Sequence, residues 1–208
     1  YTILVSAMFF VGICGLNAQN GMVSAVEKYV YPANKPKVPV DMLYMPDGLS
    51  YLSLASDGKT VKRYGTEKGE LIETVLDIDK TRYNKIEKIE GVVLSGNGEK
   101  LLVYTDSKPV YRNSFKAKYY VFEIKRNILK PLSEKFERQQ APVFSPDGRM
   151  VAFVADNNII VKKLDYDNEV AVTTDGKVNS IINGVPDWTY QEEFATLSSI
   201  SCAPDNSA

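Results

Sequence analysis

Hydrophobic positions along this chain come in short runs that alternate with turn residues. Runs such as 51–55, 101–105 and 150–155 are rich in β-branched and aromatic side chains and are bounded by Gly, Pro, Asp and Asn. They are only about four to seven residues long, whereas a helix needs ten or more. The pattern therefore predicts β-strands joined by tight turns, and it predicts no long helix.

The turns themselves repeat. Successive turns are 50, 50 and 58 residues apart, and each of the first three lies between two strand-like segments. Asp-Gly and Asn-Gly supply the backbone dihedral angles that tight hairpins need, so each turn predicts a hairpin. The four turn tripeptides are Pro46-Asp47-Gly48, Gly96-Asn97-Gly98, Pro146-Asp147-Gly148 and Pro204-Asp205-Asn206.

A third and a fourth strand follow within a repeat, most plainly at 158–164 and 169–173. Four strands in roughly 50 residues correspond to one propeller blade. The marks of WD40 and kelch repeats are missing, so the repeat is of the Ser-Pro-Asp-Gly type. We predict an all-β fold over residues 20–208, a partial β-propeller of about three four-stranded blades plus the start of a fourth. Because closed propellers have about four to eight blades, we expect the remainder in a longer protein.

The first residues differ from the rest. Residues 3–16 carry no charge, and the run is shorter than the roughly 20 residues of a membrane span. It resembles the hydrophobic region of a secretory signal, followed by small or polar residues at 17–19, and a core strand or helix fits it less well. We predict a signal peptide over 1–19 with a truncated basic region, an exported protein (periplasmic, cell-surface or secreted) and no stable membrane span.

The composition of the chain excludes several kinds of catalytic and metal-binding site. The chain has no His, which excludes Ser-His-Asp and Cys-His catalysis and His-containing zinc sites within it. We therefore predict no catalytic residue, no metal and no cofactor in this chain. Its formal net charge of −1 argues against a nucleic-acid partner. Cys14 falls in the predicted signal peptide, which leaves Cys202 without a partner, and it is expected to be a small buried hydrophobe.

The third interval between turns is longer than the first two, and the surplus falls in 179–196. This segment holds the only Trp of the chain and the polar run Gln191-Glu192-Glu193. A loop inserted between blades opens on the axial channel or rim, where propellers bind ligands. The alternative is a solvated turn with its Trp packed on the third blade, and periodicity by itself favours that alternative.

Two motifs resemble one known family. Asp187 to Phe194 (DWTYQEEF) is similar to the Asp-Trp-Val-Tyr-Glu-Glu-Glu segment of the dipeptidyl peptidase IV family of prolyl oligopeptidase-type serine peptidases. Residues 111–120 resemble that family's Arg-His-Ser segment in the preceding blade, and the agreement extends over most of 47–205. The resemblance implies an eight-bladed propeller followed by an α/β-hydrolase domain with Ser, Asp and His, a domain that lies outside this chain.

In that family the last two Glu hold the α-ammonium of the substrate and the Arg contacts a substrate carbonyl oxygen. The resemblance thus places substrate binding on Glu192, Glu193 and Arg112. It implies release of X-Pro or X-Ala dipeptides from peptides with a free N-terminus. The full-length protein is expected to be able to form a homodimer. Gln191, Asn113 and Thr189 depart from the family pattern; Gln191 removes one charge.

Two physical points bear on these residues. Adjacent residues of a strand point to opposite faces, so Glu192 and Glu193 converge on one ammonium only if the backbone there is helical or bent. Arg112 belongs to a basic, aromatic stretch, 108–138. Such a stretch can be interpreted as a nucleic-acid-binding face, but two strands with solvated charges explain it better. The alternatives for the function are a non-catalytic propeller module that binds a peptide or cell-wall ligand, and a related peptidase that releases tripeptides.

Overall fold

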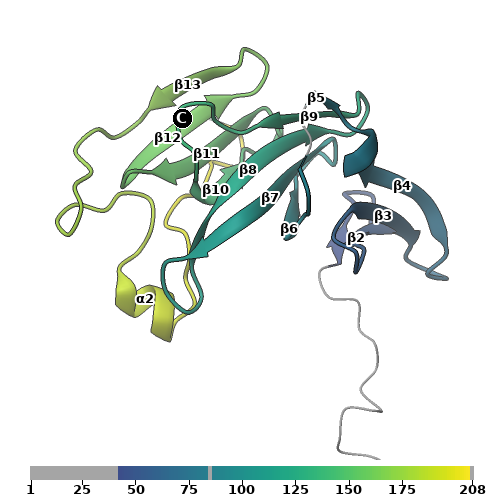
Figure 1. Ribbon diagram of the computed structural model, residues 1–208, viewed down its shortest axis with the longest axis horizontal. Helices are drawn as coiled ribbons and strands as arrows, with labels where there is room; N and C mark the ends of the chain where they lie inside the picture. Colours follow the sequence, from purple (N-terminus) through teal and green to yellow (C-terminus); the bar gives the residue numbers. More distant parts are fainter. Residues whose placement is uncertain (1–41, 84–85, 207–208) are drawn as a thin grey trace, which may run out of the picture. The chain divides into compact units, whose positions relative to one another are not determined.

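The computed structural model describes residues 42–83 and 86–206, and these are almost entirely β-structure. Their helices are one 3-10 turn, η2 (Ile78–Lys80), and one short α-helix, α2 (Trp188–Glu193). The all-β prediction is therefore confirmed (Figure 1). Among the described residues, none of the helices has the length and apolarity needed to cross a membrane. The signal peptide predicted over 1–19, with Cys14, lies outside the described residues.

Three sheets, antiparallel except for one pair of strands in the second, follow one another along the chain (Figure 1). The first sheet has the order β1-β2-β3-β4: β1 (Leu43–Tyr44), β2 (Ser50–Leu54), β3 (Thr60–Gly65) and β4 (Leu71–Asp77). The second has the order β5-β9-β8-β7-β6: β5 (Arg82–Tyr83), β6 (Gly91–Leu94), β7 (Lys100–Pro109), β8 (Phe115–Glu123) and β9 (Ile128–Pro131). The third has the order β10-β11-β12-β13: β10 (Gln140–Phe144), β11 (Met150–Ala155), β12 (Asn158–Lys163) and β13 (Asn168–Ala171).

Each sheet contains the four-stranded meander expected for a blade, with the hairpins where the turns predicted them. The second sheet has one strand more, because β5 pairs in parallel with β9. The sequence does not show this strand, since both of its residues are exposed and carry no hydrophobic alternation.

The core lies between neighbouring sheets, so the middle sheet is buried on both faces. Leu101 and Val103 of β7 pack with residues of the first sheet, whereas Leu102 between them packs with residues of the third. Successive strand residues point to opposite faces, and a strand buried on both sides therefore reads as a continuous hydrophobic run. Phe122 and Phe153 are the bulkiest fully buried side chains of these two clusters.

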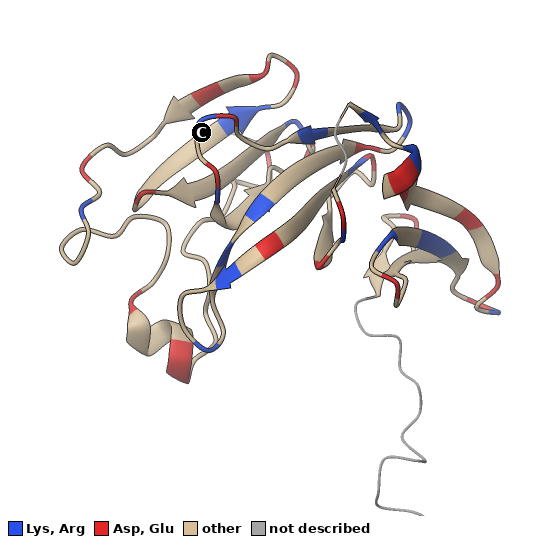
Figure 2. Cartoon of the chain, in the orientation of Figure 1, with Lys and Arg blue, Asp and Glu red and all other residues tan. Residues whose placement is uncertain are grey.

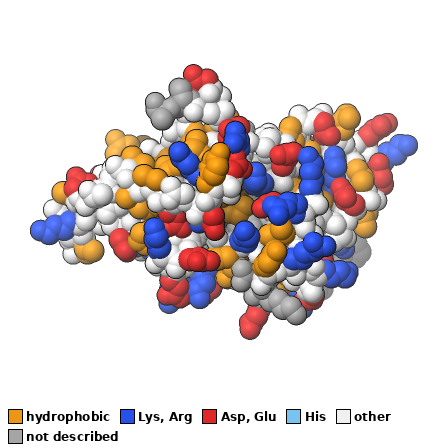
Figure 3. Space-filling model, turned by 90° about the horizontal axis from the view of Figure 1, so that it is seen from above, with side chains coloured by type: hydrophobic (Ala, Val, Ile, Leu, Met, Phe, Trp, Pro, Cys, Tyr) orange, Lys and Arg blue, Asp and Glu red, His pale blue; other side chains and the backbone are white. Residues whose placement is uncertain are grey.

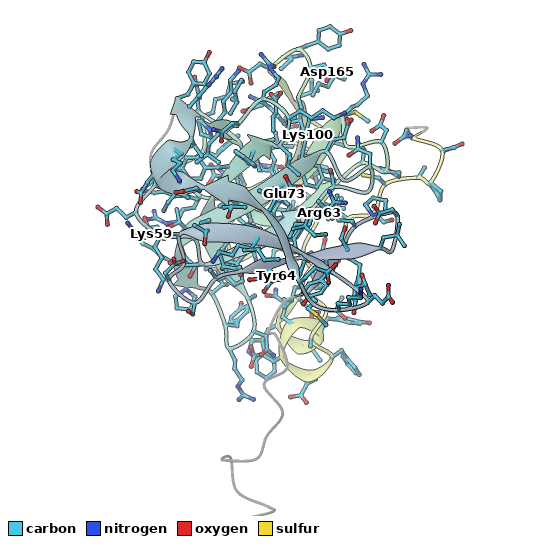
Figure 4. All side chains as sticks on the ribbon, turned by 90° about the vertical axis from the view of Figure 1, so that its right-hand side faces the viewer. Lys59, Arg63, Tyr64, Glu73, Lys100 and Asp165 are labelled. Atoms are coloured by element: carbon cyan, nitrogen blue, oxygen red, sulfur yellow. The ribbon has the colours of Figure 1, made fainter. Side chains whose placement is uncertain are left out.

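The turns of the second and third repeats share one hydrogen-bond pattern. In the third repeat, Ser145 Oγ donates to Asp147 Oδ1 at 2.6 Å and Arg149 N donates to the same oxygen at 3.0 Å. Asn97 accepts the equivalent two bonds in the second repeat, at 2.8 and 3.1 Å. The turns also contact each other, because Asn97 Nδ2 donates to the Asp147 carbonyl oxygen at 2.7 Å. Lys100 (labelled in Figure 4) donates to the Gly148 carbonyl oxygen at 2.9 Å.

The fourth turn also forms, with Asn206 N donating to the Ala203 carbonyl oxygen at 3.0 Å, and Asp147 N donating to Asn206 Oδ1 at 3.2 Å. Residues 194–206 nevertheless form no strand, so the first strand of a fourth blade stays a prediction. In the other repeats the hairpin partner begins three residues after the turn Asp or Asn, at Ser50, Lys100 and Met150. The same offset from Asp205 gives residue 208, which lies outside the described residues.

Basic and acidic residues are interspersed along the chain in the cartoon of Figure 2, and blue and red side chains lie next to one another on the face in Figure 3. In the stretch 108–138, Lys118 and Arg138 both pair with Asp106 and Glu137 at 2.5 to 3.2 Å. Arg63 of β3, shown beside Glu73 in Figure 4, contacts that residue and Asp47 in the same way. This mixed pattern favours the interpretation of 108–138 as strands with solvated, paired charges.

Candidate functional site

The inserted segment that carries the two candidate Glu folds back onto the third sheet. Gly184 (φ +80°) lies so close to this sheet that a Cβ there would come within 2.6 Å of Val154. Ser199 N donates to the Gly184 carbonyl oxygen at 2.9 Å, and Val185 is buried. The segment is therefore packed at both of its ends, and α2 lies between them.

α2 begins at Trp188 behind the N-cap residue Asp187, whose side chain accepts a hydrogen bond from Tyr190 N at 3.2 Å. A six-residue helix is not stable by itself, so contacts with the rest of the chain must hold it. Gln191 is its one buried residue and is 3% exposed. Its Nε2 donates to the Pro186 carbonyl oxygen at 2.6 Å. The sequence shows Gln191 only as a lost charge, and its anchoring role appears only in the structure.

Arg112 lies at the tip of the hairpin formed by β7 and β8, the two longest strands of the described chain. The turn is closed by Val110 N and Tyr111 N, which both donate to the Ser114 carbonyl oxygen at 2.8 and 3.2 Å. We call residues 110–114 the hairpin tip. Figure 1 shows this end of β7 and β8 beside α2.

The structure brings Arg112 and Glu192 into direct contact, although they are 80 residues apart in the chain. Arg112 N donates to Glu192 Oε1 at 2.8 Å, and Arg112 Nε lies 3.5 Å from Glu192 Oε2. One residue further along, Asn113 Nδ2 donates to the Gln191 carbonyl oxygen at 3.4 Å. Three contacts therefore join the hairpin tip to α2.

The exposures of the three candidate residues differ. The Glu192 side chain is 8% exposed, whereas that of Arg112 is 82% exposed. Glu193 is exposed and has no ion pair with another described residue. The site thus combines the exposed Arg112 guanidinium and the exposed Glu193 side chain with the largely buried carboxylate of Glu192. Two carboxylates against one guanidinium leave one negative charge, which favours a cationic ligand.

The helical backbone that a convergent pair requires is present, because Glu192 and Glu193 are the last two residues of α2. On a helix, neighbouring residues are separated by about 100° around the axis instead of the 180° of a strand. Both carboxylates can therefore face a ligand that lies at the C-terminal end of α2.

A cavity of about 460 Å³ lies beneath the hairpin tip, lined partly by Ser114, Phe115 and Leu197. Much of its remaining wall comes from β1, β6 and the bulge of β10, where Ala141 adopts φ +49°. Ser114 Oγ is buried and finds no hydrogen-bond partner among the described residues. The sequence carries no signal for this cavity, because it depends on strands that are far apart in the chain.

The Cys202 thiol and the Tyr119 hydroxyl both have raised pKa values. Burial, together with nearby Asp147, raises the pKa of the Cys202 thiol, which makes it a weaker nucleophile. Burial, with a smaller contribution from Tyr104, raises the pKa of the Tyr119 hydroxyl well above its usual range. Within 42–83 and 86–206, no group of three or more His, Cys, Asp or Glu is placed to hold a metal ion.

Comparisons with known proteins bear on the same residues. The family model for the N-terminal region of dipeptidyl peptidase IV (DPP IV) matches residues 95–208, which include the hairpin tip and α2. A probable dipeptidyl-aminopeptidase B of Chaetomium globosum is 36% identical over 147 residues, which are 70% of this chain and 14% of that protein. One from Podospora anserina is 39% identical over 97 residues, 46% of this chain and 10% of that protein.

Among solved structures, the crystal structure of Porphyromonas gingivalis dipeptidyl peptidase 4 is similar to this chain. It matches with a TM-score of 0.77 and 39% sequence identity, over 88% of this chain and 25% of that one. The chain thus spans only 14% of the Chaetomium relative and a quarter of the solved structure.

Proposed function

The chain belongs to the family of DPP IV N-terminal regions, and from this premise we propose that it is the propeller part of an exported serine-type dipeptidyl peptidase. In this proposal the chain binds the free N-terminus of peptide substrates and gates their access to a separate catalytic domain. The observation that supports the proposal is the contact between Arg112 and Glu192, which Glu193 follows in α2.

The charges of the site suit an N-terminal ammonium. An α-ammonium has three N–H donors and a pKa of about 7.7–8.0, so it is mostly cationic at neutral pH. The exposed Glu193 carboxylate and the remaining lone pairs of Glu192 can accept its hydrogen bonds, and such charge-assisted bonds are strong. The Arg112 guanidinium, at 82% exposure, has donors left for a substrate carbonyl oxygen.

A clamp on the N-terminus also sets the length of the product. Two extended residues span about 7 Å, so a fixed ammonium places the second peptide bond at a fixed distance from the clamp. Such a clamp selects cleavage after residue two and excludes peptides whose N-terminus is blocked. The chain itself has no His, and we expect the purified chain to leave a chromogenic Gly-Pro substrate intact.

The proposal is tested in the full-length protein by replacing both carboxylates, Glu192→Gln and Glu193→Gln. Each charge-assisted bond contributes roughly 1.5–3 kcal/mol, so the double variant should lose at least about 100-fold in kcat/KM. The matched control is the pair Glu67→Gln and Glu87→Gln, two exposed carboxylates away from the site. This control should keep wild-type kinetics.

The substrate supplies a second measurement. Acetylating its N-terminus should abolish cleavage by the wild-type protein, and kcat/KM should fall as the substrate amine loses its proton above about pH 8. Unchanged kinetics in the double variant, together with cleavage of the acetylated peptide, would contradict the proposal. A full-length protein without any peptidase activity would favour a propeller module that only binds its ligand.

A further inference from the structure

The contacts between the hairpin tip and α2 leave the two candidate Glu unequal. Glu192 uses both of its carboxylate oxygens within the chain, one toward Arg112 N and one toward Arg112 Nε. Glu193 on the next position is exposed. A ligand that approaches from solvent therefore meets Glu193 first and reaches Glu192 only beside Arg112.

The second contact of the tip has no charge. Asn113 Nδ2 donates to the Gln191 main-chain carbonyl oxygen, which belongs to the last turn of α2. Such carbonyls have no partner inside a helix, so an outside donor satisfies one of them. Asn113 therefore binds the backbone of α2, while Arg112 binds a side chain of it.

We propose that these contacts, Arg112–Glu192 and Asn113–Gln191, form a clasp that sets the spacing between the ammonium-binding and carbonyl-binding groups. In this proposal Asn113 is a positioning residue, and Glu192 positions Arg112 in addition to any contact with the ammonium. The inference rests on the proposed function, because the spacing matters only if one substrate contacts both sides of the clasp.

The clasp holds two elements that come from different sheets at a fixed spacing before the substrate binds. The hairpin tip extends from the second sheet, and α2 belongs to a segment packed on the third. A substrate that binds both elements would otherwise have to fix their relative position at the moment of binding. Contacts formed before binding remove that entropic cost, which increases affinity without any new contact to the substrate.

Asn113 provides the sharper test, since it does not contact the proposed ligand groups. Asn113→Asp keeps the shape of the side chain but replaces the donor with a carboxylate that faces a carbonyl oxygen. Asn113→His restores a donor, because imidazole Nδ1 is bonded to Cγ just as the amide nitrogen of Asn is. We expect kcat/KM for a Gly-Pro substrate to fall about three- to tenfold in the Asp variant and to return in the His variant.

A double-mutant cycle separates positioning from general stability. In an Arg112→Ala background, where the carbonyl contact is already lost, Asn113→Asp should change kcat/KM by less than about twofold. Glu192→Gln and Arg112→Ala should likewise be less than additive, whereas Glu193→Gln and Arg112→Ala should be additive. The melting temperature of each variant should match that of the wild type.

Additive effects of Asn113→Asp and Arg112→Ala, or a His variant no better than the Asp variant, would overturn the clasp. The proposed function fails by a different result, namely an active Glu192→Gln/Glu193→Gln protein that cleaves acetylated peptides. Loss of activity in that double variant together with an additive Asn113 cycle would leave the N-terminus recognition standing and remove only the clasp.

Discussion

A buried ion pair within the third sheet, hydrogen-bonded to a residue next to the second sheet, gives the strongest prediction about stability. Lys162 of β12 lies 2.6 Å from Asp167 Oδ1 and 3.3 Å from Glu169 Oε1. The Lys162 and Glu169 side chains are only 7% and 5% exposed. Ser133, which follows β9 of the second sheet, donates to the other oxygen of Glu169 at 3.1 Å.

Removing the cation alone should be costly. Lys162→Met keeps the length of the side chain but leaves the Glu169 carboxylate buried with Ser133 as its donor. Removal of one partner of a buried pair costs about 3–5 kcal/mol, because an uncompensated charge remains. Replacement of both partners, Lys162→Met with Glu169→Leu, leaves no buried charge and should stay within about 1 kcal/mol of the wild type.

Thermal unfolding followed by calorimetry measures both variants. A domain of this size shifts its melting temperature by about 2–4 °C per kcal/mol, so the single variant should melt about 6–20 °C lower. Burial opposes the charge of Lys162, but Asp167 and Glu169 outweigh it and raise its pKa. The stability from this contact is therefore present below the ordinary lysine pKa and is lost as the pH rises through the raised value. A single variant as stable as the wild type, or a double variant as unstable as the single one, would refute this reasoning.

Two further predictions concern the repeated turns. Gly148→Ala should destabilise the protein more than Gly48→Ala. Both positions have φ near +70°, but a Cβ at Gly148 would meet Asn97 at 2.7 Å, whereas none of the described atoms lies within 4 Å of a Cβ at Gly48. The difference in the free energy of unfolding, about 1 kcal/mol by chemical denaturation, should vanish in an Asn97→Ala background. Asp147→Asn should keep the turn, as Asn97 does in the preceding repeat, but should flatten the stability–pH profile below pH 4. The hydrogen bond from Ser145, followed by that from Arg149 N, lowers the pKa of Asp147. The stability that Asp147 contributes is therefore present above its pKa in the unfolded chain and is lost as the pH falls through its lowered pKa in the folded protein. An equally acid-sensitive Asn variant would speak against this assignment.

The fold class could be predicted from the sequence because its signals are local. A turn needs particular dihedral angles, and Gly, Asp and Asn supply them wherever they stand in the chain. The hairpins at Asp47, Asn97 and Asp147 therefore lie where the tripeptides placed them. Alternation with a period of two likewise marks the strands, and the buried run Leu101-Leu102-Val103 marks a strand covered on both faces. The exposed strand β5 was missed because it pairs without any such pattern.

The candidate site depends on contacts between segments far apart in the chain, and no local pattern encodes those. The sequence, through its family resemblance, named Arg112, Glu192 and Glu193, and required a bent or helical backbone for the two Glu. Only the tertiary structure decided that Glu192 is buried against Arg112 while Glu193 stays open, and that Gln191 anchors α2. The hydrogen bond between Arg112 and Glu192 joins residues that are 80 positions apart in the chain. It forms because the second and third sheets pack against each other, and this packing depends on the whole core between them.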